Sequence, residues 1–167
     1  AKVPAYQKLD YAKQDLSTAS AQLRDEGLKN LGYAAIDAQE WELAKKTALD
    51  LIASSDKKEL RGLPSGSTRH SALTIQGLAQ LGVKDVSGAE KSLIASMKVR
   101  GDTAIQNAGP NFRLAIELLD KGRIQAVDQF LLLVGSSVWR GGSKAAEWRK
   151  DLAAGKEVNL PRYSGVN

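Results

Sequence analysis

Apolar residues recur at helical spacing along most of this chain, and this pattern constrains the fold more than any other feature. In residues 6–38, successive apolar residues lie three to five positions apart, which places them on one face of a helix. These residues are Leu9, Ala12, Leu16, Ala19, Leu23, Leu28, Leu31 and Ala35. Runs of β-branched residues are short, and Ala, Leu, Lys, Gln and Glu, which all favour helices, dominate. The sequence therefore predicts an all-α protein.

The periodicity, together with glycines and prolines between the periodic segments, predicts about seven helices. They are expected at residues 6–38, 40–54, 68–81, 87–98, 111–121, 124–138 and 143–154. Gly27 is expected to bend or break the first helix, and Gly82 to close the third in a left-handed conformation. Ser87 and Glu90 have the spacing of a capping box, which predicts the start of the fourth helix.

The chain of 167 residues is long enough for one domain. We expect a single helical domain over residues 1–155, with loops at residues 57–66 and 101–110 that contain the turn-forming residues. Residues 156–167 contain Pro161 and show no periodicity. This C-terminal tail is expected to be extended and to lie on the surface or reach a neighbouring chain.

Three stretches repeat one pattern, at about residues 28–55, 67–98 and 110–138. In each, a small residue on a first helix is followed 12, 16 and 19 residues later by inward positions on a second helix. The positions that define the pattern are Gly32, Trp41, Ala44, Gly77, Ala89, Leu93, Ala115, Val127 and Leu131. A small residue lets two antiparallel helices approach closely, and a small side chain of the partner helix is expected to fill the space.

The best of these units contains Leu31-Gly32, Trp41 and Ala44 at the offsets of the tetratricopeptide repeat, which it resembles. The glycine-to-small-residue spacings are 45 and 38 residues, whereas the strict repeat has about 34. The third unit replaces the Gly and the Ala of the motif, and proline is missing at the repeat ends. The resemblance implies a divergent array in which antiparallel helix pairs stack into a short right-handed solenoid.

Gly109–Gly122 reads Gly-Pro-Asn-Phe-x-Leu-Ala-x-x-Leu-Leu-x-x-Gly, and this segment is specific. It is preceded by a helix start at Ser67–His70 and a helix turn at Val86–Lys91, and it is followed by Trp139 and Trp148. In this order of segments, residues 28–160 resemble an uncharacterised family of bacterial proteins. The resemblance implies the helical fold and adds no activity.

The composition excludes several classes of chemistry. The chain has no Cys, which excludes disulfides, zinc–thiolate sites and thiol nucleophiles. Its one histidine, His70, has no neighbouring pair of carboxylates, so it is a poor metal ligand and a poor acid–base catalyst. No apolar run reaches the roughly 18 residues that a membrane span needs. We expect no enzyme activity, no cofactor, no metal and no membrane span.

Two further motifs have a structural and a ligand-binding interpretation. Gly109-Pro110-Asn111 is better explained as a helix start than as a ligand loop, because Pro and Asn favour the first turn and the cap. Trp41, Trp139 and Trp148 are better explained as residues that fill helix interfaces than as an aromatic ligand pocket.

The net charge of +5 is unevenly distributed. Residues 1–56 carry −2, whereas residues 57–110 carry +4 and residues 140–167 carry +3. The densest basic cluster contains Lys57, Lys58 and Arg61. Glu59 interrupts it and it has no stacking aromatics, so no nucleic acid is expected as a partner. The opposite net charges of the two ends would instead attract copies of the chain to one another, head to tail.

We expect a non-enzymatic protein–protein interaction module, because the curved face of a helical array commonly binds protein segments. The groove would be formed by the first helix of each pair, and helical phase selects Asn30, Tyr33, Asp37, Arg69, Leu73, Gln76, Gln80, Arg113 and Glu117. The alternative is a self-assembling subunit of an extracellular or cell-surface filament or oligomer, since end contacts that do not close a ring make filaments. The start Ala-Lys-Val-Pro and the absence of Cys favour an exported protein, periplasmic or extracellular.

Overall fold

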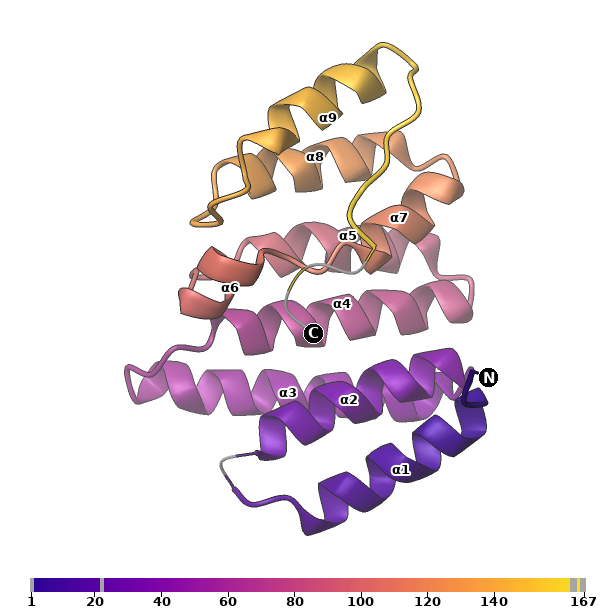
Figure 1. The fold of residues 1–167 in the computed structure, drawn as a ribbon, viewed down its shortest axis with the longest axis vertical. Coiled ribbons are helices and arrows are strands. Elements are labelled where there is room, and N and C mark those ends of the chain that lie inside the picture. Colours follow the sequence, from indigo (N-terminus) through magenta and orange to yellow (C-terminus); the bar gives the residue numbers. More distant parts are fainter. Residues whose placement is uncertain (1, 22, 163–164, 166–167) are drawn as a thin grey trace.

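The computed structural model describes residues 2–21, 23–162 and 165, and in these residues it contains nine α-helices and no strand. The helices follow one another as an array from α1 to α9 (Figure 1). They are α1 Ala5–Thr18, α2 Arg24–Asp37, α3 Trp41–Leu60, α4 Gly66–Gly82, α5 Val86–Met97, α6 Thr103–Ala108, α7 Arg113–Asp120, α8 Ile124–Gly135 and α9 Lys144–Ala153. The predicted all-α class is confirmed, whereas the expected number of seven helices is wrong for this part of the chain.

The expected helix at residues 6–38 is two helices, α1 and α2, and the break lies at residues 19–23 and not at Gly27. The hydroxyls of Ser17 and Thr18 donate to the carbonyl of Gln14, at 2.7 and 3.3 Å, and such bonds compete with helix continuation. Gly27 lies inside α2, where a Cβ would come 3.1 Å from Leu16 Cδ1. Its small size therefore serves the crossing of α1 and α2.

Two other helices cover residues expected to be loops. The helix α3 continues past Ser54 to Leu60. Ser54 donates to Asp25 and Ser55 donates to the carbonyl of Ile52, and neither bond ends the helix. The short helix α6 begins after Asp102, whose carboxylate accepts the backbone N–H of Ile105 at 3.1 Å.

Two expected caps differ from the structure. Gly82 is the last residue of α4 and the left-handed residue after it is Lys84, with φ 66°. A Cβ on Gly82 would lie 2.4 Å from the ring of Trp41, so this glycine is required for helix packing. The fifth helix is capped by Asp85, which accepts from Gly88 N–H at 2.9 Å, and not by Ser87.

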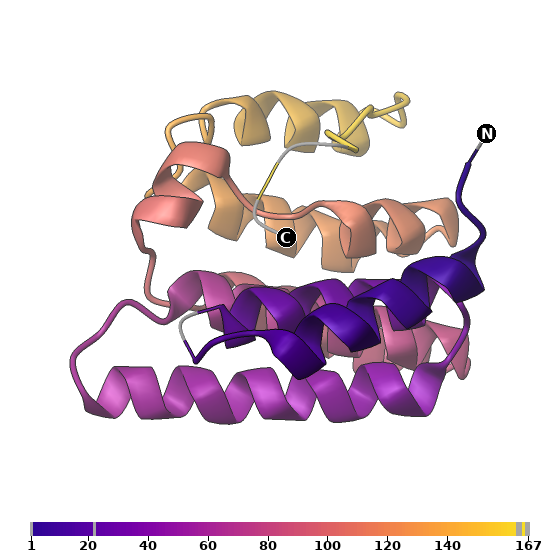
Figure 2. The same ribbon diagram turned by 60° about the horizontal axis from the view of Figure 1, so that its bottom comes forward.

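The first helices of the expected pairs, α2, α4 and α7, are in contact in that order, and each packs on its following helix α3, α5 or α8. In Figure 1, α3 lies behind α2 and α5 lies behind α7. Figure 2 shows α3 at one edge of the array and α9 at the opposite edge. Further contacts join α1 to α2 and α8 to α9, so each end of the array is covered by one more helix.

Eight of the nine repeat positions are buried and Trp41 is half-buried, so the spacing identified the core face of the helices. The space beside the glycines is filled differently from the expectation. A Cβ on Gly32 would lie 2.6 Å from Ile75 Cδ1, and one on Gly77 would lie 2.3 Å from Leu114 Cδ2. The residues that fill these gaps therefore come chiefly from the first helix of the next pair.

The three tryptophans are half-buried and pack against the core, as expected for residues that fill helix interfaces. Trp139 and Trp148 stack with ring centroids 6.5 Å apart, and both rings contact Phe112. Phe112 also meets Phe130 edge to face at 5.8 Å. This aromatic cluster joins the start of α7 to α8 and α9.

The C-terminal segment leaves α9 at Gly155 and returns along α7 without forming a helix (Figure 1). The extended tail expected at residues 156–167 is therefore seen in residues 156–162, where it lies on its own chain. Residues 163–164, 166 and 167 of that expectation lie outside the described residues.

Candidate protein-binding groove

His70 is completely buried in α4 and fixes the start of α7. Its ring donates from Nδ1 to the carbonyl of Ser96 in α5 and accepts at Nε2 from the backbone N–H of Asn111, both at 2.9 Å. A carbonyl only accepts and an amide N–H only donates, so the two partners select the neutral ring with its proton on Nδ1. Burial, opposed in part by the Ser96 carbonyl, lowers the pKa of His70 to about 4.

Asn111 connects the start of α7 to α2 through its side chain. Its side-chain Oδ1 accepts from the N–H of Arg113 at 2.9 Å, and its Nδ2 donates to the hydroxyl of Tyr33 at 3.2 Å. The Tyr33 hydroxyl also bonds to Ser71, and burial, which outweighs the nearby Arg113, raises the pKa of Tyr33 far above its usual value. The polar groups of α2, α4 and α7 thus form one connected network, which holds them in fixed positions.

An ion pair connects the same helices at the surface. Arg113 donates to Asp37 Oδ1 at 2.7 Å, and its Nε lies 3.7 Å from Glu117 one turn further along α7. An exposed ion pair of this kind contributes little to stability. It does fix the positions of two opposite charges at the rim of the network.

A surface groove of about 490 Å³ opens directly above this network, between α1, α2, the start of α7 and the C-terminal segment. Its walls contain amides, phenols and charges of both signs. The lining residues are Lys8, Tyr11, Ala12, Asp15, Asn30, Tyr33, Ala34, Asp37, Asn111, Arg113 and Arg162. The groove therefore offers donors, acceptors and two aromatic side chains in a polar setting.

The structure brings together four of the nine residues expected to form a groove, Asn30, Tyr33, Asp37 and Arg113. Glu117 lies next to them through its contact with Arg113.

The four expected groove residues of α4 do not line this groove. Arg69 is directed to α3, where it pairs with Asp56 and Glu59. Gln80 accepts from Ser92 in α5 at 2.6 Å. Leu73 and Gln76 are half-buried, and Gln76 Oε1 has no hydrogen-bond partner within the described residues. These four side chains of α4 therefore lie outside the groove between α1, α2 and α7.

Besides Ala12 and Ala34, five polar or aromatic lining residues were missed by sequence analysis: Lys8, Tyr11 and Asp15 of α1, then Asn111 and Arg162. The apolar spacing predicts one helix over residues 6–38, and a continuous helix would direct the first three away from the groove. The turn of the chain between Thr18 and Arg24 folds α1 back against α2. Residues 17–20 contain three hydroxyl side chains, but Ser54 and Ser55 lie inside α3, so hydroxyls alone would not have located this turn.

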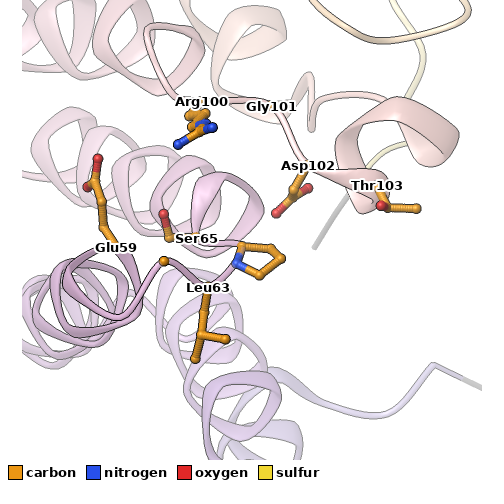
Figure 3. A pocket seen from close by; sticks show the side chains of 9 residues that line it. Glu59, Leu63, Ser65, Arg100, Gly101, Asp102 and Thr103 are labelled. Atoms are coloured by element: carbon orange, nitrogen blue, oxygen red, sulfur yellow. The ribbon is translucent and has the colours of Figure 1, made fainter.

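A smaller pocket of about 240 Å³ lies where the α3–α4 connection meets the α5–α6 connection. Figure 3 shows Glu59, Arg100 and Asp102 around it. Asp102 accepts the backbone N–H groups of Ser67 and Ile105, at 2.8 and 3.1 Å, and so caps the first turns of α4 and α6. Although burial by itself raises the pKa of Asp102, bonds from Ser67 and Ile105 lower it below its usual value. This carboxylate has a structural role.

The described residues contain no group of three or more side chains arranged to bind a metal ion. Among the helices that the structure describes, none is both long and apolar enough to cross a membrane. Both ring nitrogens of His70 are hydrogen-bonded, one to Ser96 and the other to Asn111, so neither has a free lone pair for a ligand. Comparisons of the chain with protein-family models, with curated proteins and with solved structures found no match.

Proposed function

We propose that this chain is a non-enzymatic protein-interaction module of the tetratricopeptide-like type, which binds an extended segment of another protein in the groove between α1, α2 and α7. The observation that carries the proposal is the convergence of Asn30, Tyr33, Asp37 and Arg113 in one groove, although α2 and α7 are far apart in sequence. The repeat pattern selected these four residues on the basis of helical phase alone.

The chemistry of the groove suits a peptide. A side-chain amide both donates and accepts, so it can pair with the N–H and the C=O of an extended backbone. The side chain of Asn30 is exposed in the groove and forms no hydrogen bond within the described part of the chain. Tyr11 is 57% exposed on the opposite wall and offers a flat apolar surface. Tyrosine is enriched among residues that dominate binding energy at protein interfaces.

The network beneath the groove reduces the entropic cost of binding. His70, Asn111 and Tyr33 hold the α7 wall against α2 and α4 before any partner arrives. A site with fixed walls does not have to be ordered when the partner binds, so more of the contact energy appears as affinity.

A selection of random peptides displayed against the full chain tests the proposal, followed by dissociation constants from fluorescence anisotropy. Asn30→Ala is expected to weaken a selected peptide roughly two- to tenfold, the value of one net hydrogen bond. Tyr11→Ala is expected to weaken it tenfold or more.

Asn107→Ala and Tyr6→Ala are the matched controls, because both residues are exposed and neither lines the groove. Equal loss in the controls, or selected peptides insensitive to all four changes, would refute the groove as the binding site. Light scattering over a range of protein and salt concentrations completes the test. Growth into oligomers or filaments would identify another copy as the partner and would favour the self-assembling subunit instead.

A further inference from the structure

The C-terminal segment occupies the same face of the array as the groove. It reverses direction at Gly155, which has φ +69°, and Lys156 N–H donates to Asp151 C=O at 2.9 Å to complete the turn. Residues Glu157–Arg162 then run beside α7 (Figure 1). The segment is therefore directed across the first helices of the array and not away from the molecule.

The segment binds to α7 through alternate residues. Val158 is half-buried, Leu160 is buried at 6% exposure, and Glu157 and Asn159 are exposed. This period of two is the pattern of an extended chain with one face on a surface. Within the described residues, no hydrogen bond joins Glu157–Arg162 to a helix. Apolar side chains thus provide most of the attachment.

A second hollow, of about 570 Å³, lies between this segment and α7, and it contains the apolar side chains Ile116, Leu119, Ile124 and Leu152. The hollow is only partly filled by Val158 and Leu160. A segment with a similar alternation and bulkier apolar residues would fill more of it.

The segment also reaches the groove of the proposed function. Arg162 lines both hollows, and in the groove it shares the lining with the carboxylates of Asp15 and Asp37. Beyond it, a Cβ on Gly165 would lie 2.1 Å from the carbonyl oxygen of Pro110 and 2.9 Å from Asn111 N. The backbone of Gly165 therefore lies directly on the loop that His70 fixes.

We propose that Glu157–Arg162 is a built-in occupant of this face, and that a partner segment binds by replacing it. The inference rests on the proposed function and specifies the partner. The partner is an extended peptide with two apolar residues at alternate positions, followed by proline and a basic residue, as in Val158-Asn159-Leu160-Pro161-Arg162. Its apolar residues occupy the hollow beside α7, and its basic residue lies at the acidic side of the groove.

Competition between an attached and a free segment tests the inference. The experiment uses a protein that ends at Gly155 and a fluorescent peptide with the sequence of residues 156–167. The peptide is expected to bind the shortened protein at least tenfold more tightly than it binds the full chain, because an attached segment competes at high effective concentration. Replacing the leucine and the arginine of the peptide by serine and alanine should abolish this binding.

A full-length variant keeps the inference testable if the shortened protein does not fold. Leu160→Ser should loosen the attached segment and increase peptide binding, whereas Ala154→Ser, at an exposed residue that lines neither hollow, should not. Circular dichroism verifies that each protein keeps its helices. A folded shortened protein that binds library-selected peptides but not the tail peptide would overturn this inference and leave the proposed function intact.

Two other outcomes also overturn the inference. Equal affinity of the peptide for the shortened and full-length proteins would show that the attached segment does not compete. Dimers that form in the full chain and disappear in the shortened one would show that the segment occupies a neighbouring copy. Absence of binding to any peptide, with or without the tail, would refute the proposed function itself.

Discussion

The buried histidine makes the stability of this protein depend on pH in a defined window. The unfolded chain has an ordinary histidine pKa near 6.5, whereas the folded chain holds that of His70 at about 4. Between these values the unfolded state binds more protons, so the free energy of unfolding falls as the pH falls. The loss begins near pH 6.5 and is complete below pH 4.

The expected size follows from the two pKa values. Lowering the pH from 7 to 5 should cost about 2 kcal/mol of the free energy of unfolding. The charged groups that act on His70 are Lys29, which lowers the pKa further, and Asp102, which raises it. The pKa values of Asp25 and Asp102 are lowered from 3.8, so their contributions are lost only at more acidic pH.

Urea denaturation at pH 7 and pH 5 measures this loss, and nuclear magnetic resonance measures the titration directly. The chain has one histidine, so its ring Cε1–H gives one signal. That signal should not shift in the folded protein until the pH approaches 4. His70→Gln should be less stable at pH 7 and should lose much less between pH 7 and 5. A ring that titrates near pH 6.5 in the folded protein would refute the argument.

Two further predictions concern close packing and helix capping. Gly77→Ala should gain about 1 kcal/mol of stability from helix propensity. The new methyl group forces Leu114 to shift, which costs roughly 1–3 kcal/mol of overpacking. Urea denaturation should therefore show a net decrease of up to about 2 kcal/mol in the free energy of unfolding. Gly135→Ala, whose Cβ would lie 3.5 Å from Ala145 Cβ, should be neutral or stabilising, and a similar loss in both would contradict the packing argument. Asp102→Ala leaves two backbone donors without an acceptor and should cost about 1–3 kcal/mol, whereas Asp102→Asn should cost less. Hydrogen exchange should accelerate at Ser67 and Ile105 in Asp102→Ala, and unchanged exchange there would exclude the capping role.

Local spacing was sufficient to predict the all-α class, most of the helices and their buried faces. Ala44, Leu93 and Leu131 are all buried, because a helical face that repeats every three to four residues can be identified within one element. The same information does not show which element meets that face. Gly77 of α4 was expected to contact the next helix, α5, but the residue in its gap is chiefly Leu114 of α7, three helices after α4.

The candidate site was predicted only in part, for the same physical reason. Asn111 was interpreted from its neighbours as a helix start, and its Oδ1 does bond to the N–H of Arg113. It also bonds to His70, which lies 41 positions away in the sequence, and to Tyr33, which lies 78 positions away. No local pattern encodes such partners. Leu160 is a similar case, since the surface that buries it is formed by other elements.

The contacts between α2 and α7 have a consequence for how this array unfolds. In a simple repeat array each unit contacts only its neighbours, so one end can unfold while the other remains intact. Here Tyr33 bonds to Asn111 and Asp37 pairs with Arg113, so α2 is bonded directly to the start of α7. Unfolding α2 removes contacts from α7. These bonds therefore couple α2 to α7, and the helices between them are expected to unfold together, as in a single globular domain.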